Sequence, residues 1–176
     1  MRNKRYIMLI IFGGLPGTGK TTIAKQLAKT VGAVYLRVDT IEQTLKRSNA
    51  VSKDWCGPEG YFICYELAKE NLALGLTVVA DTVNPIEITR NDWREVAQAV
   101  GVKSYEIEVV CLDKAEHRRR IEARTTDIED HQLPTWQDVL YRDYQPWNNV
   151  DLQLDTSDLS VEESVQKVIE LVQFKR

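Results

Sequence analysis

The sequence predicts a single α/β domain built on a doubly wound parallel sheet of five strands, with helices on both faces. Two observations carry this prediction. Apolar runs of strand length alternate with segments whose apolar residues recur at helical spacing, and the strand-like runs are almost continuously apolar rather than alternating. Such runs are typical of parallel strands that are buried on both faces.

Five strands and seven helices are expected along the chain. The strands are predicted at residues 6–12, 33–38, 76–80, 105–112 and 150–154. The helices are predicted at residues 20–31, from 39 onward, and at 58–74, 84–100, 113–124, 136–144 and 160–174. Asp39, Asn84, Asp113 and Ser160 stand at the expected helix starts, where their side chains are suited to cap the backbone.

Composition limits the classes of partner. The 176 residues are 43% hydrophobic and 28% charged, which suits one globular domain spanning residues 1–176. A net charge of −3 predicts no general attraction to nucleic acid or to anionic membranes, and no run approaches the length of a membrane span. The three cysteines, Cys56, Cys64 and Cys111, are odd in number and lack metal-site spacing, which favours a reduced, cytoplasmic chain.

The most specific signal is the stretch from Gly14 to Thr21, which fits the pattern G-x-x-x-x-G-K-[ST]. The apolar run at 6–12 precedes it, and Ile23 and Leu27 follow it at helical spacing. Strand, glycine-rich loop and helix therefore follow in the order that a phosphate-binding loop requires. The domain is thus expected to be a P-loop NTPase of the nucleoside-kinase-like type.

The chemistry of the loop explains its residue types. Glycines let the backbone wrap around a polyphosphate and aim N–H groups at it, while Lys20 adds a cation and the Thr21 hydroxyl can ligate Mg²⁺. ATP is the expected nucleotide because no N-K-x-D guanine-reading motif occurs. The predicted nucleotide-binding residues are Gly14, Pro16, Gly17, Thr18, Gly19, Lys20, Thr21 and Thr22.

Two acids follow the second and third predicted strands, Asp39 and Asp81. Ligands of open parallel sheets bind at the carboxyl ends of the strands, so both acids are expected near the phosphate loop. Asp39 is predicted to accept the proton of an attacking hydroxyl, although its position would also suit a simple helix cap. Asp81 is predicted to associate with Mg²⁺, with a turn-stabilising role as the alternative.

Basic residues cluster at 117–120 and again at Arg124. Arg120 and Arg124 lie four residues apart on one predicted helix face, from which they are expected to stabilise charge on a transferred phosphoryl group. The alternative is that the cations only complement the helix dipole, with Arg118 paired to Glu122.

These residues together resemble the small P-loop kinases grouped with chloramphenicol phosphotransferase, zeta-toxin-like kinases and the kinase domain of phage polynucleotide kinase. The resemblance implies that Asp39 is the general base and that Arg120 and Arg124 belong to the entry of a mobile lid at about residues 125–148. It also implies substrate or metal contacts from residues of the third strand and the loop after it: Asp81, Thr82 and Asn84.

One residue departs from this family pattern. Polynucleotide kinases carry an arginine three residues after the base, where Glu42 stands in this chain. A nucleic-acid end is therefore less favoured than a small alcohol.

The sequence thus predicts an ATP- and Mg²⁺-dependent kinase that acts on a hydroxyl of a small molecule. The acceptor is expected to enter between the helix that starts at Asp39 and the loop at 48–57, where Trp55 either faces the ligand or packs. The alternatives are a 5′-hydroxyl nucleic-acid kinase, an AAA-type ATPase and a nucleotide-binding regulatory module. The ATPase is disfavoured because residues 80–82 contain no adjacent Asp-Glu pair.

Overall fold

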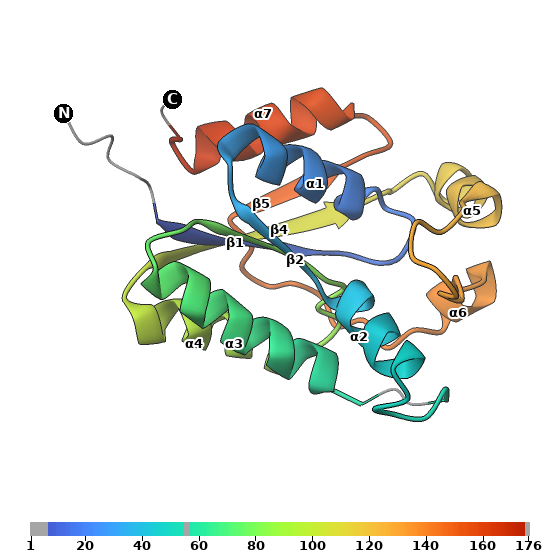
Figure 1. Ribbon diagram of the computed structural model, residues 1–176. Coiled ribbons are helices and arrows are strands. Elements are labelled where there is room, and N and C mark those ends of the chain that lie inside the picture. Colours follow the sequence, from blue (N-terminus) through green and yellow to red (C-terminus); the bar gives the residue numbers. More distant parts are fainter. Residues whose placement is uncertain (1–6, 55–56, 175–176) are drawn as a thin grey trace.

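The computed structural model describes residues 7–54 and 57–174 and confirms the predicted α/β sheet. Five parallel strands form one sheet in the order β2-β3-β1-β4-β5, with β1 at its centre (Figure 1). The strands are β1 Met8–Gly13, β2 Val34–Arg37, β3 Val78–Asp81, β4 Lys103–Val110 and β5 Leu152–Asp155. The order changes direction at β1, so the loop after β1 lies at the point where doubly wound sheets bind ligands.

Helices cover both faces of this sheet. They are α1 Lys20–Val31, α2 Val38–Arg47, α3 Glu59–Ala73, α4 Glu87–Val100, α5 Lys114–Ala123, α6 Trp136–Leu140 and α7 Val161–Leu171. Figure 1 shows α1 and α7 over one face, α3 and α4 over the other, and α2, α5 and α6 together at one end.

The strands divide the core into two apolar clusters. Along β1, Ile10 and Phe12 point into the cluster under α1 and α7, while Leu9 and Ile11 point into the cluster under α3 and α4. Each such side chain, fully removed from water, contributes about 1.5–3 kcal/mol. Because side chains alternate along a strand, Asp81 lies on the same face of β3 as Val79, which is the face under α1.

Two of the predicted helix caps are confirmed and two are wrong. Asp113 accepts hydrogen bonds from the first turn of α5, and Ser160 forms a capping box on α7. α2 instead begins one residue before Asp39, with Arg37 at the N-cap, and α4 begins after Ile86. Asn84 adopts a left-handed conformation with φ 47°, and its carbonyl accepts from a buried arginine, so the chain turns there before the helix starts.

The predicted helix at 136–144 ends earlier, at Leu140. The chain beyond it is held by another element, because Gln145 bonds to the backbone of Pro85 and Glu87 at the start of α4. Among the described residues, Cys64 and Cys111 are free and buried, and none of the helices has the length and apolar character to cross a membrane. Trp55 and Cys56 lie outside the described residues.

Candidate active site

The glycine-rich loop has a conformation that only glycine accommodates. Gly14 and Gly17 have φ angles of 141° and 83°, a region that side chains rarely enter. A Cβ atom would lie 2.2 Å from the carbonyl oxygen of Val109 at position 14 and 2.5 Å from Ile121 at position 17. The loop is therefore packed tightly against β4 and α5 at these two positions.

Two contacts that sequence reasoning missed hold backbone carbonyl groups of this loop in place. The buried His117 of α5 places its Nε2 atom 2.7 Å from the carbonyl oxygen of Pro16 and packs edge-on against Trp136. The hydroxyl of Thr156, after β5, donates to the carbonyl of Thr18 at 2.7 Å. Both contacts join residues more than a hundred positions apart, so no local pattern indicates them.

A cavity of about 1160 Å³ opens above the loop. It is lined by the loop and α1, by α2 and Tyr61, and by the segment after α5. The predicted site residues that line this cavity are Pro16, Gly17, Gly19, Lys20, Thr21, Thr22, Asp39, Arg120 and Arg124. The predicted residues outside its lining are Gly14, Thr18, Asp81, Thr82 and Asn84.

A buried arginine that sequence reasoning missed joins the acids of the site. Arg37, whose side chain is 6% exposed, places Nη1 2.8 Å from a carboxylate oxygen of Asp127. Its Nε atom lies 3.8 Å from Asp39 and 3.9 Å from Asp81. The guanidinium of Arg37 therefore lies within 3.9 Å of three carboxylates, which belong to α2, to β3 and to the chain after α5. The sequence signal that could have pointed to it is a charged residue near the end of a predicted strand.

The residues at the end of β3 are held in a buried network. Asp81 accepts a 2.6 Å hydrogen bond from the Tyr35 hydroxyl, and burial together with this carboxylate raises the pKa of Tyr35. Thr82 donates to the Tyr61 hydroxyl at 2.6 Å, and the backbone N–H of Asn84 donates to the same oxygen. The substrate or metal roles of Asp81, Thr82 and Asn84 stay predictions.

The arginines of α5 differ in their surroundings. Arg120 is held by Glu116, at 2.7 Å, and by the hydroxyl and carbonyl of Thr156. Arg124 also lines the cavity, but its side chain makes no hydrogen bond or ion pair with residues that the structure describes. Burial lowers the pKa of Arg124 from its ordinary value, yet a guanidinium still remains charged at neutral pH.

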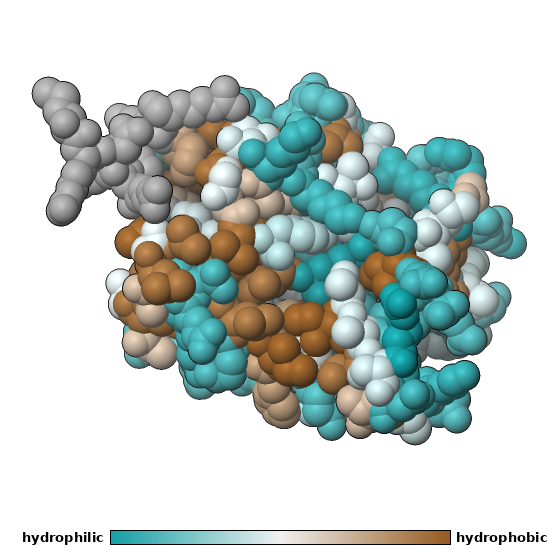
Figure 2. All heavy atoms as spheres, in the orientation of Figure 1, coloured by the Kyte–Doolittle hydropathy of each residue, from teal (hydrophilic) through white to brown (hydrophobic). Residues whose placement is uncertain are grey.

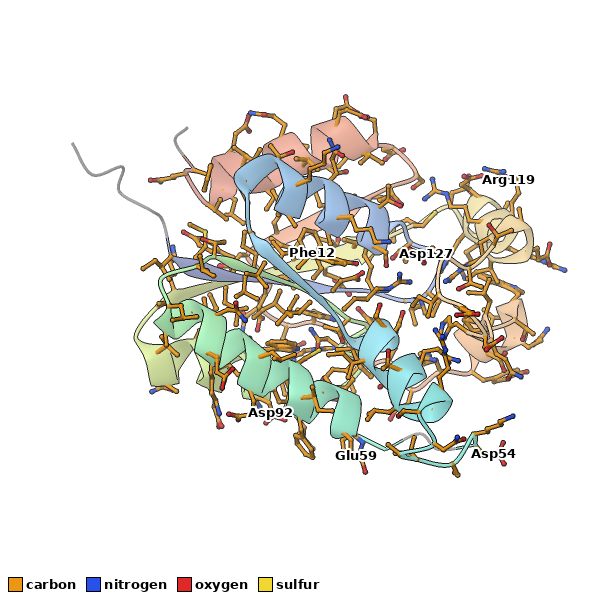
Figure 3. All side chains as sticks on the ribbon, viewed as in Figure 1. Phe12, Asp54, Glu59, Asp92, Arg119 and Asp127 are labelled. Carbon is orange, nitrogen blue, oxygen red and sulfur yellow. The ribbon has the colours of Figure 1, made fainter. Side chains whose placement is uncertain are left out.

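The other arginines of this helix follow the alternative that the sequence left open. Arg118 forms a 2.7 Å ion pair with Glu122 on the exposed surface of α5. Arg119 pairs with Glu116, and Figure 3 shows it on the outer side of the helix. Neither residue lines the cavity.

The segment between α5 and α6 reaches across the cavity. Asp127, labelled in Figure 3, lies near α1 and forms ion pairs with Lys25 of α1 and with Arg37. The hydrogen bonds from these two cations hold the pKa of Asp127 well below its usual range. Figure 2 shows hydrophilic residues gathered over this end of the molecule, whereas hydrophobic residues are more prominent over α3.

The lining of the cavity suits a polyphosphate with a hydrated cation. Among the described residues, no group of three or more His, Cys, Asp or Glu side chains could hold a metal ion by itself. Thr21, in the first turn of α1, lines the cavity beside Lys20. Mg²⁺ commonly takes few protein ligands and completes its shell with phosphate oxygens and water, so one hydroxyl at this position fits it.

Comparisons with known proteins agree with this geometry. A probable adenylyl-sulfate kinase of Halalkalibacterium halodurans is 27% identical over 169 residues, covering 93% of this chain and 79% of that protein. An adenylyl-sulfate kinase of Halothermothrix orenii is 27% identical over 184 aligned residues, covering 99% of this chain and 94% of that protein.

Two solved structures share the fold. The APS kinase CysC of Mycobacterium tuberculosis, in complex with AMPPNP and APS, has a TM-score of 0.67 and 22% identity, covering 95% of this chain and 98% of that one. A gluconokinase from Sinorhizobium meliloti has a TM-score of 0.65 and 19% identity, covering 97% and 94% of the two chains.

The family match covers most of the sequence. Residues 9–142 match the AAA domain family, a range that runs from β1 to just beyond α6 and includes the phosphate loop and most of the cavity lining. The chain therefore belongs to the AAA domain family.

Proposed function

We propose that this protein is an ATP- and Mg²⁺-dependent phosphotransferase that moves the γ-phosphate of ATP to a hydroxyl of a small molecule. The main observation in support of this proposal is that one cavity is lined by four suitable residues: Lys20 and Thr21 at the phosphate loop, Asp39 on α2 and Arg124 after α5. These are the residue types that bind a triphosphate, accept a proton and stabilise phosphoryl charge. The relatives named as adenylyl-sulfate kinases and the neighbour named as a gluconokinase support a kinase.

The loop end of the cavity would hold the nucleotide. The backbone N–H groups around Gly17 and Gly19 and the ammonium of Lys20 would bind the phosphates at the start of α1. Thr21 would be the protein ligand of Mg²⁺, and Asp81, which lies outside the cavity lining, stays a candidate acid for it. When bound, Mg²⁺ neutralises charge on the phosphate oxygens.

The part of the cavity around Asp39 and Tyr61 would hold the acceptor. The acceptor oxygen attacks the γ-phosphorus, the bond to the β-phosphate oxygen breaks, and ADP leaves. The hydroxyl proton passes to the carboxylate of Asp39 and from there to water. Arg124, which lacks a protein partner among the described residues, would neutralise the oxygens of the transferred group.

The proposal is tested by incubating the protein with Mg·ATP and a panel of small alcohols, sugars and nucleosides while ADP release is measured. We expect ADP release that depends on the acceptor, with Lys20→Ala as the control that abolishes it. ADP release at the same rate without an acceptor would instead favour an ATPase. Transfer only to 5′-hydroxyl oligonucleotides would favour a nucleic-acid kinase, and ATP binding without turnover would favour a regulatory module.

A further inference from the structure

A second carboxylate lies beside the proposed base. Glu42 follows Asp39 by three residues on α2, and both side chains line the cavity. Residues with this spacing are neighbours on one helix face, with Cβ atoms about 5–6 Å apart. An acceptor whose hydroxyl reaches Asp39 therefore presents its adjacent group to Glu42.

The carboxylate of Glu42 has no partner within the described part of the chain. It forms neither a hydrogen bond nor an ion pair there, although Lys46 on α2 and Arg142 beyond α6 exert weaker electrostatic attraction. Two other acids that line the cavity are engaged, because Asp127 pairs with two cations and Asp138 belongs to the capping box of α6. Glu42 is thus available to a ligand.

The neighbouring helix is shaped to admit this side chain. Gly60 in α3 lies against Glu42, and a Cβ atom at position 60 would stand 2.4 Å from Cγ of Glu42 and 3.2 Å from its Oε1. No positive φ angle accounts for this glycine, since it lies inside a regular helix. Its absent side chain is what leaves room for the Glu42 stem.

A hydrogen-bond donor completes this end of the cavity. The Tyr61 oxygen accepts from the Thr82 hydroxyl, at 2.6 Å, and from the backbone N–H of Asn84, at 3.2 Å. With two donors already directed at that oxygen, the phenolic proton of Tyr61 is left for the cavity that its side chain lines. Burial raises the pKa of Tyr61 to about 12, so this proton is present at neutral pH.

We propose that Glu42 is a specificity-determining residue that selects acceptors carrying a hydrogen-bond donor, a second hydroxyl or an ammonium, beside the reacting hydroxyl. Acceptors with an anionic group at that place are rejected, because it would face Glu42 and Asp39 together. The inference rests on the proposed kinase function and names its substrate class. It separates this chain from the adenylyl-sulfate and gluconate kinases to which it is similar, whose named acceptors are anions.

The selectivity is expected to depend on pH. Burial and the neighbouring Asp39 raise the pKa of Glu42 to about 7, against the opposing attraction of Lys46 and Arg142. Tyr61 and Cys64 of α3 face the same carboxylate and stay neutral, since burial raises both of their pKa values to about 12. Glu42 is therefore mainly ionised at pH 8 and mainly protonated at pH 6, so discrimination against anions should weaken as the pH falls.

The test uses acceptors that share a carbon skeleton and differ in the charge of one group: sugars, the corresponding amino sugars and the corresponding sugar acids, each on several carbon skeletons. Initial rates of ADP release with Mg·ATP give kcat/KM for each compound. For the wild-type protein, we expect kcat/KM to be on the order of ten- to a hundredfold higher for neutral or amino members than for the acids. Glu42→Gln should reduce that ratio to a few fold, mainly through KM, and should remove the change in the ratio of neutral sugars to sugar acids between pH 6 and 8.

Two further variants separate selectivity from damage to the fold. Glu59→Gln changes an exposed acid at the start of α3, labelled in Figure 3, and should leave the ratio unchanged. Gly60→Ala would place its methyl group against Cγ of Glu42 and displace that side chain, so it should shift the ratio in the same direction as Glu42→Gln, and its thermal stability is measured alongside. Equal or better use of the sugar acids by the wild type, or an unaltered ratio in Glu42→Gln, would overturn the inference alone. No acceptor-dependent ADP release from any compound would overturn the proposed function, and this inference with it.

Discussion

At the scale of single residues, Asp39 carries the proposed proton transfer. It lies in the first turn of α2, lines the cavity, and makes its nearest charged contact with Arg37. Asp39→Asn keeps the shape of the side chain but cannot accept a proton. We expect kcat to fall by about 10²- to 10⁴-fold, while the affinity for ATP, measured by equilibrium titration, is unchanged. Full phosphotransfer by this variant would show that Asp39 is not the base.

Single residues also show where sequence reasoning stopped. The positions of Asp39 and Asp81 are predictable because each stands at the end of a strand that the sequence predicts, which is a local signal. Arg37 was not recognised, because its importance comes from an ion pair with Asp127, ninety positions further along the chain. The capping role that the sequence offers for Asp39 is also wrong, since Arg37 occupies the N-cap position, without a side-chain capping hydrogen bond, and Asp39 lies inside the first turn.

At the scale of elements, the segment between α5 and α6 is predicted to act as a lid. Asp127 of this segment forms ion pairs with Lys25 of α1 and with Arg37 of β2. Asp127→Asn removes the charge that Lys25 and Arg37 bind. We expect faster amide hydrogen exchange across residues 125–134, with little change in α1 or β4. Asp130→Asn is the matched control, because Asp130 is exposed in the same segment and asparagine tolerates its φ of 59°. Equal exchange in both variants would mean that this ion pair does not hold the segment.

The same ion pair gives the segment a pH dependence of known sign. A carboxyl group whose pKa is lowered on folding contributes stability above its unfolded value, about 4, and loses it as the pH falls through the lowered pKa. The protection factors of the wild-type segment, which correct for the intrinsic exchange rate at each pH, should therefore stay constant at neutral pH and fall progressively below about pH 5.

At the scale of the whole molecule, Arg90 joins segments that are distant in sequence. It is 1% exposed and donates hydrogen bonds to the carbonyls of Asn84 and Pro146, at 3.0 Å each, and stacks over Trp147. Further bonds reach the carbonyls of Pro85 and Gln145. The buried guanidinium thus holds the loop after β3 against the chain that follows α6.

Replacing this guanidinium should weaken the entire fold. Arg90→Lys keeps a positive charge but removes the planar guanidinium group with its several N–H donors. Some of the buried carbonyls that accept from Arg90 therefore lose their hydrogen bonds. We expect a loss of about 3 kcal/mol in the free energy of unfolding, measured by urea denaturation. Arg118→Lys, on the exposed face of α5, should change that free energy by less than about 0.5 kcal/mol. A similarly small change in the free energy of unfolding for Arg90→Lys would show that Arg90 does not hold the two segments together.

The sequence by itself determined the parallel α/β sheet, the phosphate loop and the caps at Asp113 and Ser160. Each of these depends on residues that are close together in the chain, where apolar spacing, glycine and short polar side chains act directly on the local backbone.

Tertiary structure alone decided which charges meet. The pairing of Arg37 with Asp127, the support of Pro16 by His117 and the space that Gly60 leaves for Glu42 all join separate elements. Contacts of this kind depend on how the helices pack against the sheet, which no local pattern encodes. One short stretch of sequence, the phosphate loop, is enough to predict a site for a triphosphate. The part of the cavity proposed for the acceptor forms only when α2, α3 and the chain after α5 pack together.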